Sequence, residues 1–316
     1  MYFPYLRGKQ FEFLALREFA ESNPGNTNII PIIEPVKRQY SSINTAITTM
    51  INNSMRFAII LNPTDGEFKH SSNNEILPEL SGLETHNTNW IPAFLYKNNP
   101  EKLLGYANNN HLSQLMIILP NGADVDDERL ITFLANEKIE YIVNGAASNS
   151  SRRSRVKLLR LGKKLIVLED KFRSRPKNSD YADPSDEFFS DSFAYYEDDN
   201  LFGFSDYTTL PKEYNDTGML PFAVAIHLTY LREEEEIHIH HFVSDNTRGR
   251  ENIQGKFQEA ATKIGPFYEE GGYPATHAVT EFIRRAQSDD GYPGLGYIKK
   301  LSIENHLELI NRLLQK

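Results

Sequence analysis

The chain has 316 residues, with 34 Lys and Arg residues, 43 Asp and Glu residues and a formal net charge of −9 at pH 7. This charge excludes a basic nucleic-acid-binding surface over the whole molecule, so only a local patch could serve that purpose. The chain contains no cysteine, which excludes disulfides, thiolate catalysis and cysteine-ligated zinc. Its apolar runs are too short for a transmembrane helix, and its first residues lack the order of a signal peptide. We therefore expect a cytoplasmic protein without a membrane partner.

Eight short apolar runs follow one another at regular spacing, and most of them end in a polar residue. Continuous apolar runs of this length are typical of parallel strands that are buried on both faces. They cover residues 2–6, 29–33, 57–61, 90–95, 115–119, 139–143, 164–168 and 201–205.

Stretches with helical spacing of apolar side chains separate many of these runs. One covers residues 10–21, others begin near Ser41 and at Pro100, and two more cover 126–137 and 150–161. Alternating strands and helices of this number predict an α/β fold, a (β/α)8 TIM-type barrel. A doubly wound open sheet is the alternative, but it would need an edge strand, and a glycine-rich first turn is missing.

The pattern changes after the eighth run. Residues 222–230 and 237–243 flank an acidic segment and predict an antiparallel hairpin. Three helical stretches follow, at 253–264, 276–286 and 303–314. We therefore expect a barrel over residues 1–220 and a β-hairpin with helices over 221–316, packed on the barrel as a single compact unit because no Gly/Ser linker separates them.

Active sites of TIM-type barrels lie at the carboxyl ends of the strands. That rule gathers Glu34, Asp170 and Asp206 at one mouth. Three carboxylates there could hold Mg²⁺ or Mn²⁺, or divide into a general acid and a general base. The alternative is structural, since polar residues at strand ends often satisfy backbone groups and pair with one another.

Cations and an amide are expected at the same mouth. Arg7 and Lys9 follow the first strand and could hold a phosphate or another anion. Asn62 and Lys171 follow the third and seventh strands and would complete the anion-binding set.

Histidines cluster in the predicted hairpin. His238 and His240 are two residues apart and so project from the same face of a strand. A turn centred near Arg232 and Glu233 would place His227 opposite His238. Three imidazoles on one face could bind Zn²⁺ or Fe²⁺, with Asp245 within reach. The alternative is a solvated ribbon, because the turn between the strands is polyacidic.

Charge is segregated around the seventh run. A basic block covers residues 152–177, and an acidic stretch covers 180–199. The block could form a local patch for nucleic acid or a nucleotide, with the acidic stretch as a movable lid. The alternative is a solvated helix face followed by an acidic surface loop.

Residues 3–16 (FPYLRGKQFEFLAL) and 30–35 (IPIIEP) resemble the bacteriophage beta-protein family. The segments 203–207 (GFSDY), 225–230 (AIHLTY) and 240–245 (HHFVSD) are similar to one bacterial branch of it. The resemblance covers essentially the whole chain. It implies a setting in mobile elements and defence islands beside a small PD-(D/E)XK nuclease-like protein. Family-type positions are matched at Lys9, Glu12, Glu34, Asp206, His227 and His241.

Two functions are compatible with this sequence. The first is a subunit of an antiphage-defence or mobile-element module that binds a nuclease-like partner, with a phosphate-bearing ligand or nucleic acid at the barrel mouth. The second is a metal-assisted phosphoester or nucleotide hydrolase, in which Glu34, Asp170 and Asp206 are ligands or acid–base groups.

Overall fold

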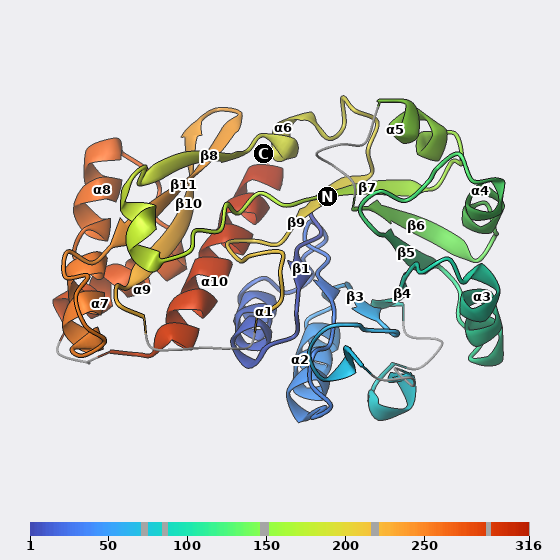
Figure 1. Cartoon of the computed structure of the whole chain (residues 1–316), viewed down its shortest axis with the longest axis horizontal. Helices are drawn as coiled ribbons and strands as arrows, with labels where there is room; N and C mark the ends of the chain where they lie inside the picture. Colours follow the sequence, from blue (N-terminus) through green and yellow to red (C-terminus); the bar gives the residue numbers. More distant parts are fainter. Residues whose placement is uncertain (71–74, 84–87, 146–151, 216–220, 289–291, 316) are drawn as a thin grey trace. The chain divides into compact units, whose positions relative to one another are not determined.

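A computed structural model describes residues 1–70, 75–83, 88–145, 152–215, 221–288 and 292–315 (Figure 1). The chain divides into two compact units. The first comprises Met1–Asp170 and Ala194–Tyr207, and the second comprises Lys171–Phe193 and Thr208–Lys316. The second unit therefore begins before the boundary expected at residue 221, and it includes a segment that the sequence assigned to the barrel.

The first unit is the predicted (β/α)8 barrel. Eight parallel strands are hydrogen-bonded in the order of the chain. A parallel bridge between Tyr2 and Phe204 joins the last strand to the segment just before the first. The strands are β1 Tyr5–Leu6, β2 Ile32–Ile33, β3 Phe57–Ile60, β4 Trp90–Leu95, β5 Leu115–Leu119, β6 Ile139–Asn144, β7 Lys164–Glu169 and β9 Gly203–Asp206.

Side chains fill the interior of the barrel. Phe3, Tyr5 and Tyr207 belong to this core, together with alternate residues of the neighbouring strands. Since successive side chains of a strand point to opposite faces, Tyr2 and Asp206 face outward, away from this core. The interior is therefore a packed core rather than an open channel.

Helices α1 (Gln10–Ser22) and α2 (Ser41–Asn52) pack against each other in this unit. Helix α1 buries Phe13, Leu16 and Phe19. The remaining elements of the helical layer are α3 Pro100–Asn109, α4 Glu128–Leu134, α5 Arg152–Leu159, α6 Ser192–Tyr195 (which crosses the boundary between the units) and the 3₁₀ turns Gly66–Phe68 and Leu77–Glu79.

The second unit is built on a three-stranded antiparallel sheet. Strands β10 (Ala225–Glu233) and β11 (Glu236–Val243) form the predicted hairpin, and β8 (Asp186–Ser190) pairs with β11. The acidic stretch 180–199 is therefore not simply a surface loop, because it contains β8. Glu187 and Phe189 of that strand are buried. A 3₁₀ turn, Asn178–Ala182, precedes the strand.

Four helices complete this unit, where three were expected. Their apolar faces and one face of the hairpin form a common core that includes Ile226, Leu228, Phe257 and Phe282. The helix predicted over 253–264 ends at Ala261, the helix that begins at Ile264 was not expected, and the last helix begins before residue 303. The helices are α7 Ile253–Ala261, α8 Ile264–Gly271, α9 His277–Gln287 and α10 Leu295–Leu314. None of the helices in the described ranges is both long and apolar enough to cross a membrane.

Candidate functional site

The predicted ring of carboxylates does not form, because Glu34 and Asp206 lie on opposite faces of the barrel wall. The side chain of Glu34 meets the interior residue Tyr5, whose hydroxyl donates to Glu34 Oε2 over 2.7 Å. Asp206 faces outward and accepts a hydrogen bond of 2.6 Å from the hydroxyl of Tyr2. The two carboxylates are thus separated by the strands that carry them and cannot act on one atom of a substrate.

Glu34 is held by three residues at the end of the barrel core. Besides Tyr5, Arg7 Nη1 donates to Oε2 over 3.1 Å, and the backbone N–H and hydroxyl of Thr64 lie 3.0 and 3.3 Å from Oε1. The Glu34 side chain is 2% exposed. A buried carboxylate with this many donors is a structural group, because its lone pairs are already engaged.

Asp170 follows β7 and is exposed. No three side chains of His, Asp or Glu are grouped so that they could hold a metal ion in the ranges that the structure describes. The residues present therefore do not fit Mg²⁺, Mn²⁺ or Zn²⁺ held by Glu34, Asp170 and Asp206.

The predicted anion-binding residues have different surroundings. Arg7 bonds Glu34, lies 3.3 Å from Asp65 and lies over the adjacent rings of Tyr5 and Tyr207, with its Cζ 5.0 and 5.2 Å from their centroids. Lys9 is the N-cap of α1, Asn62 is bonded to the backbone of Leu95, and Lys171 is the first residue of the second unit.

The hairpin register corrects the predicted histidine site. His227 pairs with His241, and it is Tyr230 that pairs with His238. The turn is centred on Glu234 and Glu235 rather than on Arg232 and Glu233, since Glu233 pairs with Glu236. An odd shift of register exchanges the faces of a strand. His227 therefore lies on the face opposite His238 and His240, and these three histidines do not form a metal site.

The face with His238 and His240 is organised by Asp186. Asp186 Oδ1 lies 2.8 Å from His238 Nδ1, and Oδ2 lies 3.2 Å from His240 Nδ1. Tyr230 donates its hydroxyl to Oδ2 over 2.7 Å. Burial raises the pKa of Asp186, but these hydrogen bonds outweigh it and hold the value at about 2. Asp186 is thus an ionised carboxylate that ties β8 to the hairpin.

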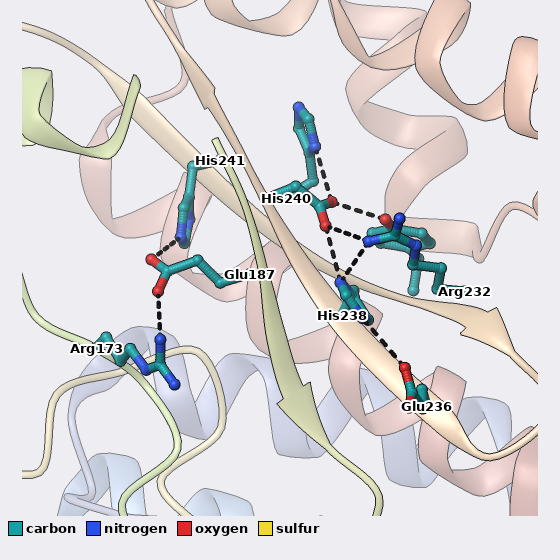
Figure 2. Close-up of polar contacts among 9 residues, drawn as sticks. Arg173, Glu187, Arg232, Glu236, His238, His240 and His241 are labelled. Carbon is teal, nitrogen blue, oxygen red and sulfur yellow. Dashed lines mark hydrogen bonds and ion pairs between the residues drawn. The ribbon is translucent and has the colours of Figure 1, made fainter. Parts of the chain in front are cut away.

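A second chain of contacts runs along the opposite face. Arg175 Nη2 donates to Glu187 Oε1 over 2.7 Å, and Arg173 Nη1 donates to Oε2 over 3.1 Å. Glu187 Oε1 lies 3.5 Å from His241 Nε2, and His241 Nδ1 lies 2.8 Å from His227 Nδ1. Figure 2 shows His241, Glu187 and Arg173 on one side of the strands, away from His238, His240 and Arg232. We call this series of side-chain contacts the Glu187–His241–His227 relay.

Aromatic rings border the relay. The ring of Tyr181 lies 4.6 Å from that of His227 and 4.8 Å from that of His241, between centroids. Phe172 meets His227 edge-on at 5.1 Å. These rings fix the imidazoles and displace water from part of their surface, while His227 itself remains partly exposed.

The surroundings of His227 and His241 favour the neutral form of both imidazoles. Burial lowers the pKa of His227 well below its usual value, and the positive charges of His241 and Lys299 add to this effect. Burial also lowers the pKa of His241, to about 4, although Glu187 opposes the shift. Burial raises the pKa of Glu187, but the hydrogen bonds from Arg175 and Arg173 keep this pKa below the usual value.

Several members of the relay had no distinct signal in the sequence. Glu187 lay in the stretch assigned to a loop, and Arg173 and Arg175 were part of the basic block. His241 belongs to the histidine cluster of the predicted hairpin and to the family-type positions, but the spacing did not place it opposite His227. The available signal for β8 is the aromatic pair Phe188–Phe189 within the acidic stretch, since aromatic residues are enriched in strands.

Several cations of the basic block form ion pairs within their own unit. Arg153 and Lys157 pair with Asp126, Arg155 pairs with Asp199, and Arg173 and Arg175 pair with Glu187. Only the last group belongs to the relay.

No family model, curated protein or solved structure matches the chain.

Proposed function

We propose that this protein is a binding subunit that recognises a phosphate-bearing ligand at the Glu187–His241–His227 relay. It acts with a nuclease-like partner in an antiphage-defence or mobile-element module. The observation that supports a phosphate-bearing ligand is that exposed cations lie near a pair of histidines within the second unit. The partner and the setting rest on the resemblance of the chain to the beta-protein family.

The charges around the relay suit an anion. Three cations interact with residues of the relay: Arg173, Arg175 and Lys299. They are opposed by two carboxylates, those of Glu187 and Asp180. The side chain of Arg173 is 68% exposed, and Lys299 is also exposed. A guanidinium carries five N–H donors and binds phosphate oxygens in a fork. Arg173, which gives one hydrogen bond to Glu187, is therefore suited to meet a phosphate at the surface.

The barrel mouth gives less support to the same function. Glu34 and Arg7 are engaged with each other, and aromatic side chains fill the space beneath them. A hydrolase that relies on Glu34, Asp170 and Asp206 would need these carboxylates to converge, and Asp206 faces the other way.

Ligand binding is tested by fluorescence anisotropy with a short fluorescein-labelled single strand of DNA or RNA, and by calorimetry with inorganic phosphate. We expect binding by the wild-type protein and at least a tenfold weaker affinity for the double variant Arg173→Ala/Lys299→Ala. Arg153→Ala, which removes an arginine of similar exposure (72%) from α5, is the matched control. Equal affinity of the double variant and the control would contradict the proposed site.

The partner is tested by co-expression with a PD-(D/E)XK nuclease-like protein encoded beside it, followed by size-exclusion chromatography. Co-elution supports the proposal. Separate elution at micromolar concentration would overturn this part of it and leave the ligand site to be judged by its own experiment.

A further inference from the structure

We infer that the relay is also a metal-independent acid–base site, in which His227 is the general base for hydrolysis of a phosphoester. His241 and Glu187 are positioning residues that set its tautomer. This inference rests on the proposed function, because the same cations would hold the ester. The inference adds a hydrolysis reaction to a site for which the proposed function is only the binding of a phosphate-bearing ligand.

The contacts of the histidine pair indicate which nitrogen of His227 is basic. Glu187 is ionised and can only accept, so the 3.5 Å ion-pair contact with His241 favours a proton on His241 Nε2. In a neutral His241 the other nitrogen, Nδ1, then has to accept. The 2.8 Å contact between the two Nδ1 atoms is therefore donated by His227. A neutral His227 with its proton on Nδ1 carries the free lone pair on Nε2, which is the nitrogen a general base uses.

Glu187 is held for this task by both of its oxygens. Arg175 bonds Oε1 and Arg173 bonds Oε2, at 2.7 and 3.1 Å. The side chain of Glu187 is 5% exposed and that of His241 is 2% exposed. A buried carboxylate that is fixed at two points cannot rotate away from His241, so the tautomer of His227 is fixed as well.

Several charged or titratable groups influence the pKa values of the histidine pair. The pKa of His227 is affected by His241 and Lys299, and that of His241 by Glu187, His240 and Arg175. Because burial and the cations keep both rings neutral near pH 7, His227 is available as a base at that pH. The positive charge that it gains in the reaction is stabilised through His241 by Glu187, as in other carboxylate–histidine sites.

The reaction is a hydrolysis that balances without a further reactant. His227 Nε2 takes a proton from water as the water oxygen forms a bond to phosphorus. The bond between phosphorus and the leaving oxygen breaks, and the proton passes from His227 to that oxygen. The products are a phosphate with one fewer ester bond and an alcohol, and His227 is neutral again. The cations at the relay stabilise the charge that develops on the phosphoryl oxygens.

The opposite face of the same sheet provides a matched control. His238 also contacts a carboxylate through an imidazole nitrogen, at 2.8 Å from Asp186. Among the described residues no second histidine is bonded in series there, and Asp186 bonds His238 and His240 directly. A replacement of His238 therefore removes a histidine–carboxylate contact from the same strand without affecting the relay.

The experiment measures turnover of bis(p-nitrophenyl) phosphate and of a labelled single strand by the purified full chain, with and without EDTA. We expect hydrolysis that EDTA does not change. His227→Gln should lower kcat by about 10²-fold or more, with melting temperature and affinity for the labelled strand retained. His238→Gln should stay within about twofold of the wild type, since general-base effects are confined to the residue that transfers the proton.

Glu187→Gln tests the positioning role through a readout that a loss of stability would not reproduce. An amide can donate to His241 as well as accept, so the tautomer is no longer fixed. We expect a lower kcat with a changed acid limb of the pH profile. His227→Asn provides a second variant if His227→Gln does not fold.

Binding without turnover of either probe would overturn this inference and leave the proposed function intact. Turnover that EDTA abolishes, or that His227→Gln and His227→Asn leave unchanged, would overturn it as well. Absence of binding would refute the proposed function itself.

Discussion

The Nδ1 atoms of His227 and His241 lie 2.8 Å apart on one face of the β10–β11 hairpin. Neither nitrogen can donate unless it carries a proton, so this contact couples the protonation of one ring to that of the other. Two protonated rings would face each other with like charges. The pair is therefore stable with at most one added proton, and its surroundings favour none.

Acid should destabilise the protein through this pair. The usual histidine pKa is 6.5, and burial lowers that of His241 to about 4 and that of His227 well below 6.5. The unfolded chain therefore binds protons that the folded chain does not, and stability falls as the pH decreases from 6.5 towards 4. Urea unfolding of His227→Gln/His241→Gln should show a weaker pH dependence in this window than the wild type. An identical dependence would show that the pair does not govern it.

Glu34→Gln should destabilise the barrel by about 3 kcal/mol, because it removes the buried partner of an ion pair and leaves Arg7 with only the partly exposed carboxylate of Asp65. The side chain of Arg7 is 13% exposed. The measurement is chemical denaturation. Glu101→Gln, whose side chain is 72% exposed in its pair with Arg129, is the control and should leave the melting temperature nearly unchanged. A comparable loss in both variants would contradict the structural role of Glu34.

Asp206→Asn should cost about 1–3 kcal/mol of stability, because the hydroxyl of Tyr2 is buried with it. Tyr2→Phe should cost a similar amount, and the double variant should cost less than the two together, since both single changes break one contact. Affinity for the labelled strand should not change. Additive losses of stability in the double variant would argue against a direct hydrogen bond between Tyr2 and Asp206. A loss of affinity in Asp206→Asn would show that Asp206 takes part in ligand binding.

Salt should weaken ligand binding through Arg173. A nucleic-acid contact to one phosphate changes the slope of log affinity against log salt concentration by about 0.7–0.9. Arg173→Ala should therefore reduce the slope by about this amount, with little change in stability because the side chain is 68% exposed. Arg153→Ala should leave the slope unchanged. The slope is measured by anisotropy titrations at several salt concentrations, and an unaltered slope in Arg173→Ala would exclude this phosphate contact.

The barrel could be predicted from the sequence because its signal is local. Each strand is a short apolar run buried on both faces, and the runs at 90–95 and 115–119 coincide with β4 and β5. Periodicity of this kind depends only on neighbours along the chain. The order and number of strands follow from it, as does the adjacency of the first and the last, which the Tyr2–Phe204 bridge confirms.

The direction of individual side chains could not be predicted in the same way. A strand that is apolar on both faces gives no indication of which residues face inward, so Asp206 and Tyr207 were equally suited to the mouth. Hydrogen bonding between neighbouring strands decided this, and it placed Tyr207 beside Arg7 and Asp206 beside Tyr2. Register in the hairpin was decided by its acidic two-residue turn, which lacks the glycine or asparagine that marks most such turns.

The sequence by itself thus determined the eight parallel strands, the hairpin and the residue types available for acid–base or anion chemistry. Tertiary structure decided which of them meet. It separated Glu34 from Asp206 and His227 from His238, and it joined Glu187, His241 and His227 across β8, β11 and β10. The physical reason is that strand pairing is non-local: a change of register by an odd number of residues alters no composition, yet it exchanges the faces of the sheet.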